Sequence, residues 1–210
     1  MELTLISMPV YIKKTILLCY VLLAFQVNAQ DYFQQHVSYK ISVSLNDLKH
    51  ELNGFETLTY TNHSPSVLKE IFLHLYPNAY KNNNTALAME FLGDGKLSFQ
   101  NAHDSLKGFI DGLDFKVNEA SVKFETDPKD IDVGKLILNE PLLPGQSIVI
   151  TTPFHVKIPD ARFSRLGHTK QAYYVSQWYP KPAVFDKNGW HAMPYLSQGE
   201  FYSEFGSFEV

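Results

Sequence analysis

The last thirty-eight residues of the chain, 173–210, constrain its fold more than any other stretch. They contain both tryptophans, Trp178 and Trp190, and a phenylalanine or tyrosine at nine further positions. Aromatic side chains at this density favour strands, and the prolines Pro180 and Pro182 are unfavourable inside a helix. The stretch therefore predicts a strand, a structured loop and a further strand, with the rings packed against a sheet.

Apolar residues at every second position predict strands along most of the remaining chain. The alternation is clearest in 147–158, where Ile148, Ile150, Phe154 and Val156 share one face of a strand. A turn is predicted at Asn53-Gly54, and the other predicted strands are 36–45, 55–61, 68–76, 109–117, 121–125 and 135–138. No helical periodicity separates these strands. The chain is therefore predicted to be all-β, an antiparallel β-sandwich or a saddle-shaped sheet.

Residues 78–108 are rich in Asn, Gly, Asp and Ser and predict a long excursion with a short helix near Leu87 to Phe91. Long insertions of this kind are often functional or mobile, and the sequence leaves that choice open. His74, just before the excursion, is interpreted as a core histidine rather than a metal ligand.

The first twenty-nine residues have the pattern of a signal peptide. Lys13 and Lys14 precede an apolar run from Ile16 to Phe25, which is too short to span a bilayer. Val27-Asn28-Ala29 is a small-residue cleavage site, and a retained membrane anchor is the alternative. We therefore expect a signal peptide over 1–29, a β-domain over 30–210, and a secreted or periplasmic protein with no membrane contact after cleavage.

Charge excludes some classes of partner for the processed chain. Removing 1–29 takes away Glu2, Lys13 and Lys14, which leaves 21 acidic and 16 basic side chains, or a net charge of −5. No basic patch or aromatic-basic stripe is present, so nucleic acid is not an expected partner. The single cysteine, Cys19, lies in the predicted signal peptide, so the processed chain would be free of disulfides.

A family resemblance appears in the aromatic stretch. Ser176-Gln177-Trp178-Tyr179-Pro180, followed by Asp186 and an aromatic strand, resembles the end of the amino-terminal β-domain of zinc aminopeptidases of peptidase family M1, the relatives of aminopeptidase N and leukotriene hydrolase. The resemblance is strong over 173–210 and looser over 39–158. It implies a domain that walls a peptide-binding cleft and packs on a catalytic domain. The final strand is still alternating at Val210, so we expect a domain truncated before that catalytic domain.

The same resemblance implies substrate-binding roles for three consecutive residues. In the family, a Gln-aromatic-Glu/Gln segment lines the cleft, and its third residue reaches toward the free α-amine of the peptide. Gln177 and Trp178 match this pattern, but the third position is Tyr179, which carries no charge. We therefore expect Gln177 to line the cleft and Tyr179 to be a weaker amine anchor, through its phenol oxygen or its ring face. That both side chains merely brace the Pro180–Pro182 loop is the open alternative.

Catalytic and metal-binding residues are not predicted in this chain. The family's zinc site needs two histidines four residues apart on a helix, with a glutamate between them. No two of the eight histidines have that spacing, and after His50-Glu51 the required position is Gly54. Zinc is therefore expected only in the catalytic domain. Leu87 to Phe91 lacks both ends of the family's Gly-x-Met-Glu-Asn loop, and Asp130, Asp132 and Gly134 are interpreted as a turn rather than half a calcium loop.

Two functions from different classes remain. The first is the non-catalytic amino-terminal domain of a secreted zinc aminopeptidase, whose partners are peptide amino termini and the catalytic domain. The second is a stand-alone module that binds carbohydrate or another surface. It would need an exposed ring cluster, for which Trp178, Tyr179, Trp190 and Tyr195 are the candidates.

Overall fold

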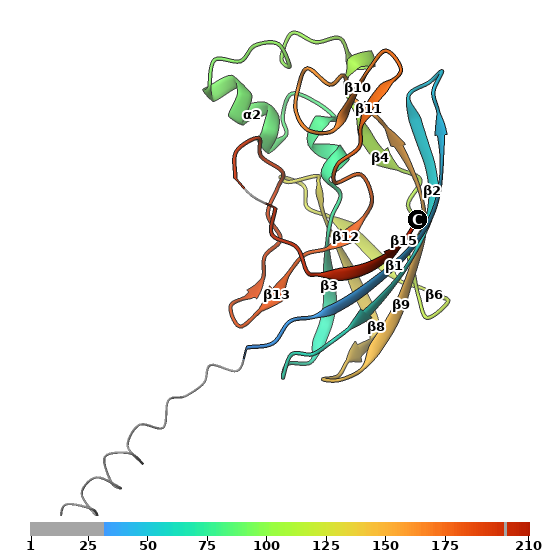
Figure 1. Ribbon diagram of the computed structural model, residues 1–210. Helices are drawn as coiled ribbons and strands as arrows, with labels where there is room; N and C mark the ends of the chain where they lie inside the picture. The colour runs from blue at the N-terminus through green and yellow to red at the C-terminus, as the bar shows by residue number, and fades with distance from the viewer. Residues whose placement is uncertain (1–31, 200) are drawn as a thin grey trace, which may run out of the picture. The chain divides into compact units, whose positions relative to one another are not determined.

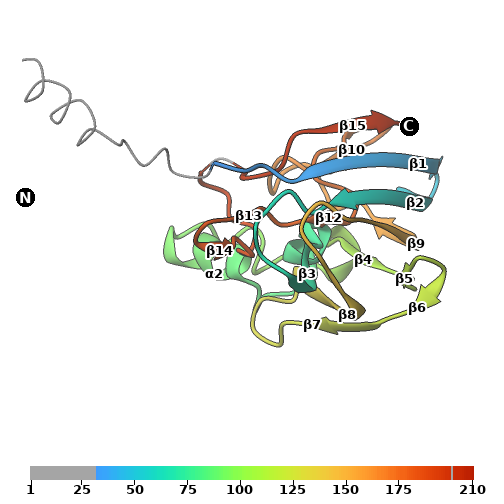
Figure 2. The ribbon, with the colours of Figure 1, turned by 90° about the horizontal axis from the view of Figure 1, so that it is seen from below.

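Two packed β-sheets form the body of the protein in the computed structural model, which describes residues 32–199 and 201–210. The larger sheet has the order β15-β1-β2-β9-β5-β6, with β4 also paired to β9, and the smaller has the order β12-β3-β8-β7. Figure 2 shows β1 and β2 in one layer above β3, β8 and β7 in the other. The prediction of an all-β, largely antiparallel sandwich is confirmed. The predicted signal peptide lies outside the described residues.

The strands of the two sheets vary widely in length. The larger sheet contains β1 (His36–Asn46), β2 (Glu51–Thr61), β4 (Phe109–Asp111), β5 (Lys116–Val117), β6 (Ala120–Ser121), β9 (Ser147–Lys157) and β15 (Gly206–Glu209). The smaller contains β3 (Leu68–His74), β7 (Lys123–Thr126), β8 (Val133–Leu142) and β12 (Lys181–Pro182). Two hairpins stand apart, β10 (Gly167–Thr169) with β11 (Ala172–Tyr174), and β13 (Phe185–Asp186) with β14 (Gly189–Trp190).

The main core lies between the sheets, and the predicted alternation places its residues there. Leu58 of β2 pairs with Ile150 of β9 and with Tyr39 of β1, and all three are buried. Ile71 of β3 and Leu136 of β8, both fully buried, belong to the same core cluster. Burial of this apolar face is the main term that holds the two layers together.

The predicted turn at Asn53-Gly54 is wrong. The turn occupies 47–50, where the Asn46 side chain accepts from the backbone N–H groups of Leu48 and Lys49 at 3.2 and 3.1 Å. Gly54 instead lies within β2, and a Cβ atom there would be 2.2 Å from the Phe154 ring. The glycine is needed because a neighbouring strand fills its side-chain space, which is a long-range cause.

Three predicted strands have different bounds for identifiable reasons. The strand predicted over 109–117 is two strands, β4 and β5, because Gly112 has a φ of 68° and interrupts the pairing. The strand predicted over 121–125 is also divided, since β6 belongs to the larger sheet and β7 to the smaller. β3 ends at His74 because the 3-10 helix η2 (Tyr76–Tyr80), with Pro77 in its first turn, follows almost at once.

The excursion over 78–108, which contains helix α2 (Ala86–Gly93), lies at one end of the ribbon (Figure 1), and its apolar side chains belong to a second core. Helix α2 confirms the predicted short helix, and its cap is Thr85, whose hydroxyl accepts from the Ala88 N–H at 3.2 Å. The short helix η3 (Asp104–Leu106) follows. This second core contains Tyr76, Ala79, Tyr80, Leu87, Ala88, Phe91, Phe99, Phe163, Leu166 and Tyr195.

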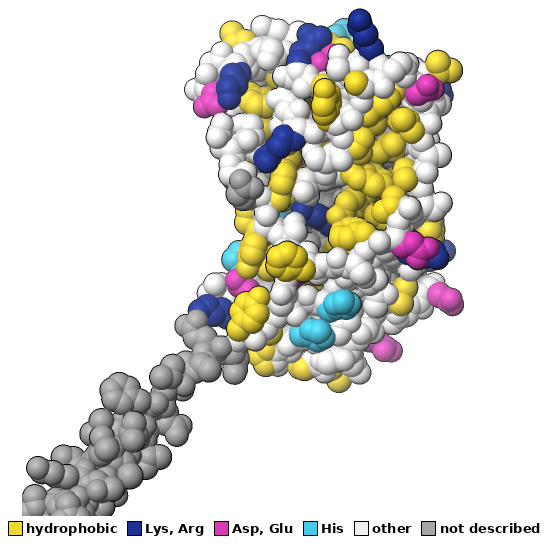
Figure 3. All heavy atoms as spheres, in the orientation of Figure 1, with side chains coloured by type: hydrophobic (Ala, Val, Ile, Leu, Met, Phe, Trp, Pro, Cys, Tyr) yellow, Lys and Arg dark blue, Asp and Glu magenta, His cyan; other side chains and the backbone are white. Residues whose placement is uncertain are grey.

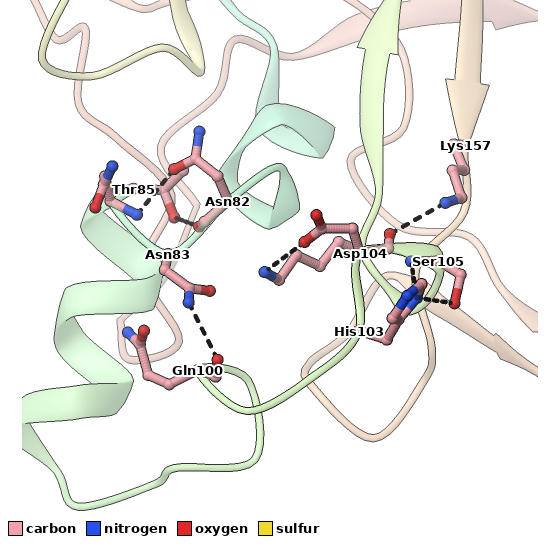
Figure 4. A network of polar contacts seen from close by, with 10 residues as sticks. Asn82, Asn83, Thr85, Gln100, His103, Asp104, Ser105 and Lys157 are labelled. Carbon is pink, nitrogen blue, oxygen red and sulfur yellow. Dashed lines mark hydrogen bonds and ion pairs between the residues drawn. The ribbon is translucent and has the colours of Figure 1, made fainter.

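Polar contacts join parts of the excursion to one another and to β9 (Figure 4). The Asn83 amide donates to the Gln100 carbonyl at 3.1 Å, and the Lys157 ammonium of β9 donates to the Asp104 carbonyl at 3.2 Å. The segment is therefore a structured part of the domain rather than an irregular insertion.

The carboxyl-terminal strand is short and pairs parallel to β1. Only Gly206–Glu209 form β15, with Phe208 opposite Tyr39. The preceding residues leave the sheet because Phe201 packs on the rings of Tyr76 and Tyr195. Among the described residues, no helix is long and apolar enough to cross a membrane.

Candidate functional site

The predicted substrate segment joins β11 to β12 and has an unusual backbone. Gln177 is half-buried and has a φ of 55°, in the left-handed region that non-glycine residues rarely adopt. The preceding Ser176 hydroxyl donates to the Arg165 carbonyl at 2.9 Å and ties the segment to the loop before β10. A rare conformation held by its surroundings is common at binding sites.

Trp178 turns toward the protein interior. Its ring lies 5.8 Å from that of Phe154 on β9 and 5.4 Å from that of Tyr179, measured between centroids. It packs against both core clusters while remaining half-buried. Trp178 thus joins the two cores and has a structural role that a cleft position alone would not require.

Tyr179 packs against the edge of the larger sheet. Its ring meets Tyr39 edge-on at 5.4 Å and Phe208 at 6.0 Å. Burial, followed by the nearby Glu56 carboxylate, raises the pKa of the Tyr179 phenol to about 12. The phenol therefore stays neutral near pH 7, so its oxygen can accept a hydrogen bond but offers no charge to an ammonium.

Glu56 of β2 is a buried carboxyl group that the sequence analysis missed. Only 3% of the residue is exposed, and Oε2 has no hydrogen-bond partner among the described residues. Burial raises the pKa of Glu56 well above its usual value. The sequence signal was present, because Glu56 shares one strand face with Leu58 and Tyr60, positions that the period of two assigns to the core.

A second buried group, Lys181, follows the predicted segment by two residues. Its ammonium donates to the Ser203 hydroxyl at 2.6 Å and lies 5.0 and 5.4 Å from the ring centroids of Tyr76 and Phe201. Burial lowers the pKa of Lys181 to about 8. Its position between Pro180 and Pro182 was visible in the sequence, but not its burial.

His74 is a core histidine, as interpreted from the sequence. It is 1% exposed and its ring stacks on Tyr76 with centroids 4.5 Å apart. Burial, followed by the Lys181 charge, lowers the pKa of His74 to about 3. The imidazole is therefore neutral at physiological pH.

The described residues contain no group of three or more His, Cys, Asp or Glu side chains that could hold a metal ion. Asp132, one residue of the suspected half calcium loop, is buried and accepts from the Tyr195 N–H at 2.6 Å. Asp127 accepts from the N–H groups of Lys129 and Asp130 at 2.8 and 3.0 Å, which is the geometry of a turn. A turn is present at 131–132, closed by the Val133 N–H donating to the Asp130 carbonyl at 2.8 Å, but the expected solvated turn is wrong for Asp132, which is 1% exposed.

Solved structures that are similar to this chain include M1 zinc metallopeptidases. A scan of protein-family models gives no match to the chain, and neither does a search of curated proteins. Among solved structures, an M1 zinc metallopeptidase from Deinococcus radiodurans is similar over 60% of this chain, at 16% identity and a TM-score of 0.34. A mutant of that enzyme bound to a Tyr-Ser-Ala substrate is similar over 77% of this chain, at 13% identity and a TM-score of 0.36.

The matched region is a small part of those enzymes, since it covers 20% and 28% of their chains. At these identities and TM-scores the similarity carries no argument about activity. The fold assignment rests on the two sheets themselves.

Proposed function

We propose that residues 30–210 form the non-catalytic amino-terminal β-domain of a secreted or periplasmic zinc-dependent aminopeptidase. The domain walls one side of the peptide-binding cleft through Gln177, Trp178 and Tyr179. It docks on a catalytic domain that supplies the zinc and the reaction chemistry. Its partners are that domain and the amino termini of peptides.

The observation that supports docking is an uncovered part of the inner face of the larger sheet. Along β1, Tyr39 and Ile41 are buried, but Val43 and Leu45 on the same face are 37% and 47% exposed. Phe208, paired beside Tyr39, is 51% exposed. Figure 3 shows apolar side chains gathered in a hollow on the right of that view. A contiguous apolar surface of this kind is typical of an interface.

The alternative of a carbohydrate-binding module is less well supported. Tyr195 is 2% exposed, and Trp190 is half-buried with its ring 5.0 Å from that of Phe185. Trp178 and Tyr179 are also half-buried, so the four candidate rings are committed largely to packing. An exposed stacking platform would need at least two of them free.

The gene provides the first test of this proposal. A reading frame that continues beyond the codon for Val210 and encodes His-Glu-x-x-His would support it. A stop codon at that point, followed by unrelated sequence, would overturn it in favour of a stand-alone module.

Association provides the second test. The purified chain, mixed with the catalytic domain, should form a one-to-one complex in sedimentation velocity. The double substitution Val43→Asp and Leu45→Asp should weaken association by about tenfold or more, because it places charge on the apolar face. Leu48→Asp is the matched control, since Leu48 is 86% exposed in the turn of the hairpin. Equal weakening by the control would contradict docking through this face.

The third test measures zinc content and hydrolysis for the chain without the catalytic domain. We expect the chain alone to bind no stoichiometric zinc and to hydrolyse no aminoacyl reporter, because a catalytic zinc needs three protein ligands and an open position. Elemental analysis showing one zinc per chain, with chelator-sensitive hydrolysis, would contradict this expectation.

A further inference from the structure

A hollow of about 700 Å³ lies beside the predicted substrate segment, and two arginines line it. Arg162 and Arg165 come from the loop between β9 and β10, and Thr169 and Tyr174 come from the β10–β11 hairpin. Ser164 also lines it, with its hydroxyl 3.0 Å from the Tyr195 phenol oxygen. We call this hollow the Arg165 pocket.

The two arginines have different electrostatic environments. Arg162 is matched by a carboxylate, since its Nε and Nη2 donate to the two oxygens of Asp160 at 2.9 and 3.0 Å. Arg165 forms no ion pair with a carboxylate among the described residues. Because Asp160 also lines the hollow, the pocket carries two positive charges and one negative charge, a net charge of +1.

Aromatic contacts hold the Arg165 guanidinium. Its central carbon lies 4.3 Å from the ring centroid of Phe201 and 5.8 Å from that of Tyr195. A guanidinium placed over a ring is held by the ring face and keeps its in-plane N–H donors for another acceptor. A carboxylate fits those donors best, because its two oxygens match the guanidinium fork.

The backbone of Arg165 is fixed to the segment that is proposed to line the cleft. The Ser176 hydroxyl donates to the Arg165 carbonyl, and Gln177 is the next residue along the chain. This hydrogen bond holds the backbone of Arg165 next to the residue that precedes Gln177.

We propose that the Arg165 pocket binds a carboxylate of a peptide, with Arg165 as the bidentate donor. This rests on the proposed function, because it takes the ligand to be a peptide. The carboxylate comes either from the α-carboxyl terminus of a short peptide or from an acidic side chain. In both cases the pocket favours anionic peptides over their neutral counterparts.

The test uses the chain alone and follows amide chemical shifts during peptide titrations. Ala-Ala-Ala is compared with its carboxyl-terminal amide to probe the α-carboxylate. The amide of Ala-Asp-Ala is compared with that of Ala-Asn-Ala to probe the side chain. At least one carboxylate peptide should bind about tenfold more tightly than its neutral counterpart, because it gains a charge-assisted pair of hydrogen bonds. The largest chemical-shift changes should occur at residues that line the pocket.

Variants assign the effect to one side chain. Arg165→Gln should abolish the preference for carboxylate, and Arg165→Lys should retain part of it, because a lysine keeps the charge but loses the planar fork. Lys69→Gln, which removes an exposed charge from β3, should leave the preference unchanged. Thermal unfolding of each variant checks the fold.

Two results would overturn the proposal. One is equal affinity for carboxylate and neutral peptides in the parent, or an unchanged preference in Arg165→Gln. The other is binding of inorganic phosphate with the same shifts and equal affinity, which would indicate a general anion site. Neither result bears on docking to a catalytic domain, which is measured by association, so the two proposals fail separately.

Discussion

The imidazole ring of His50 lies against that of His168, with centroids 3.6 Å apart and planes 15° from parallel. His50 belongs to the turn of the β1–β2 hairpin, and His168 belongs to β10. His50 Nδ1 is also 2.8 Å from the Tyr173 phenol oxygen, and that phenol donates to the Asp47 carbonyl at 3.2 Å. Two hairpins that are far apart in the sequence are therefore joined by a pair of histidines.

This contact predicts a pH dependence of stability. Burial, followed by the electrostatic interaction with His50, lowers the pKa of His168 in the folded state, and a backbone hydrogen bond with Lys170 and the Asp160 carboxylate partly oppose this. The unfolded chain then binds more protons than the folded chain as pH falls through about 6.5. The free energy of unfolding is therefore not reduced by His168 above that pH, and it decreases as the pH falls below it.

His168→Gln should reduce the difference in the urea midpoint between pH 7.5 and pH 5. His103→Gln, which removes an exposed histidine beside η3, is the control and should leave that difference unchanged. If His168→Gln shows the same loss on acidification as the parent, the assignment to this pair is wrong.

The contact between Gly54 and Phe154 predicts a site that does not tolerate a side chain. Gly54→Ala places a Cβ atom 2.2 Å from the Phe154 ring in the absence of movement, and overpacking of this kind costs about 1 to 3 kcal/mol in free energy of unfolding. Gly93→Ala in α2 meets no atom within 4 Å and should be close to neutral. Urea denaturation of both variants measures the difference, and equal stability of the two would contradict the packing argument.

The ring stack of Tyr39 and Phe208 predicts how β15 is held. The two rings are 4.5 Å apart and 7° from parallel, and Lys40 pairs with Glu209 at 3.1 Å, although both of those side chains are highly exposed. Exposed ion pairs contribute little, so the stack should dominate. Phe208→Ala should cost about 0.5 to 1.5 kcal/mol or more and should expose the carboxyl-terminal strand to proteolysis.

Phe205→Ala is the matched control for β15, because Phe205 is 83% exposed. It should change neither stability nor the rate of cleavage. Similar effects of the two substitutions would show that the stack is not what holds the strand.

The substrate segment predicts unequal effects in the assembled enzyme. Gln177→Ala should lower kcat/KM for peptides with a free amino terminus by up to about tenfold, the equivalent of one hydrogen bond between the cleft and the peptide. Tyr179→Phe should have a smaller effect, because the phenol is neutral and its ring face remains. Amino-terminally blocked peptides provide the comparison, and parental rates in both variants with unchanged folding would exclude the cleft assignment.

The local sequence pattern was enough to predict secondary structure in segments where neighbouring residues alone specify it. The alternation over 147–158 predicted β9 within one residue at its end, and Leu87 to Phe91 lies inside α2. These two predictions are confirmed because a strand with one buried face and a capped helical turn are both specified by neighbouring residues. The all-β class and the interior position of His74 followed from the same patterns.

Only the tertiary structure decided the features that depend on distant partners. Gly54 was placed in a turn because nothing near it in the sequence reveals the Phe154 ring that fills its side-chain space. The stacking of His50 on His168, the parallel pairing of β15 with β1 and the burial of Lys181 against Tyr76 and Phe201 likewise arise between residues far apart in the chain. The sequence therefore determined which segments form strands and which face of each is apolar, whereas sheet packing decided which polar groups lie together, because contacts between strands are set by the fold as a whole.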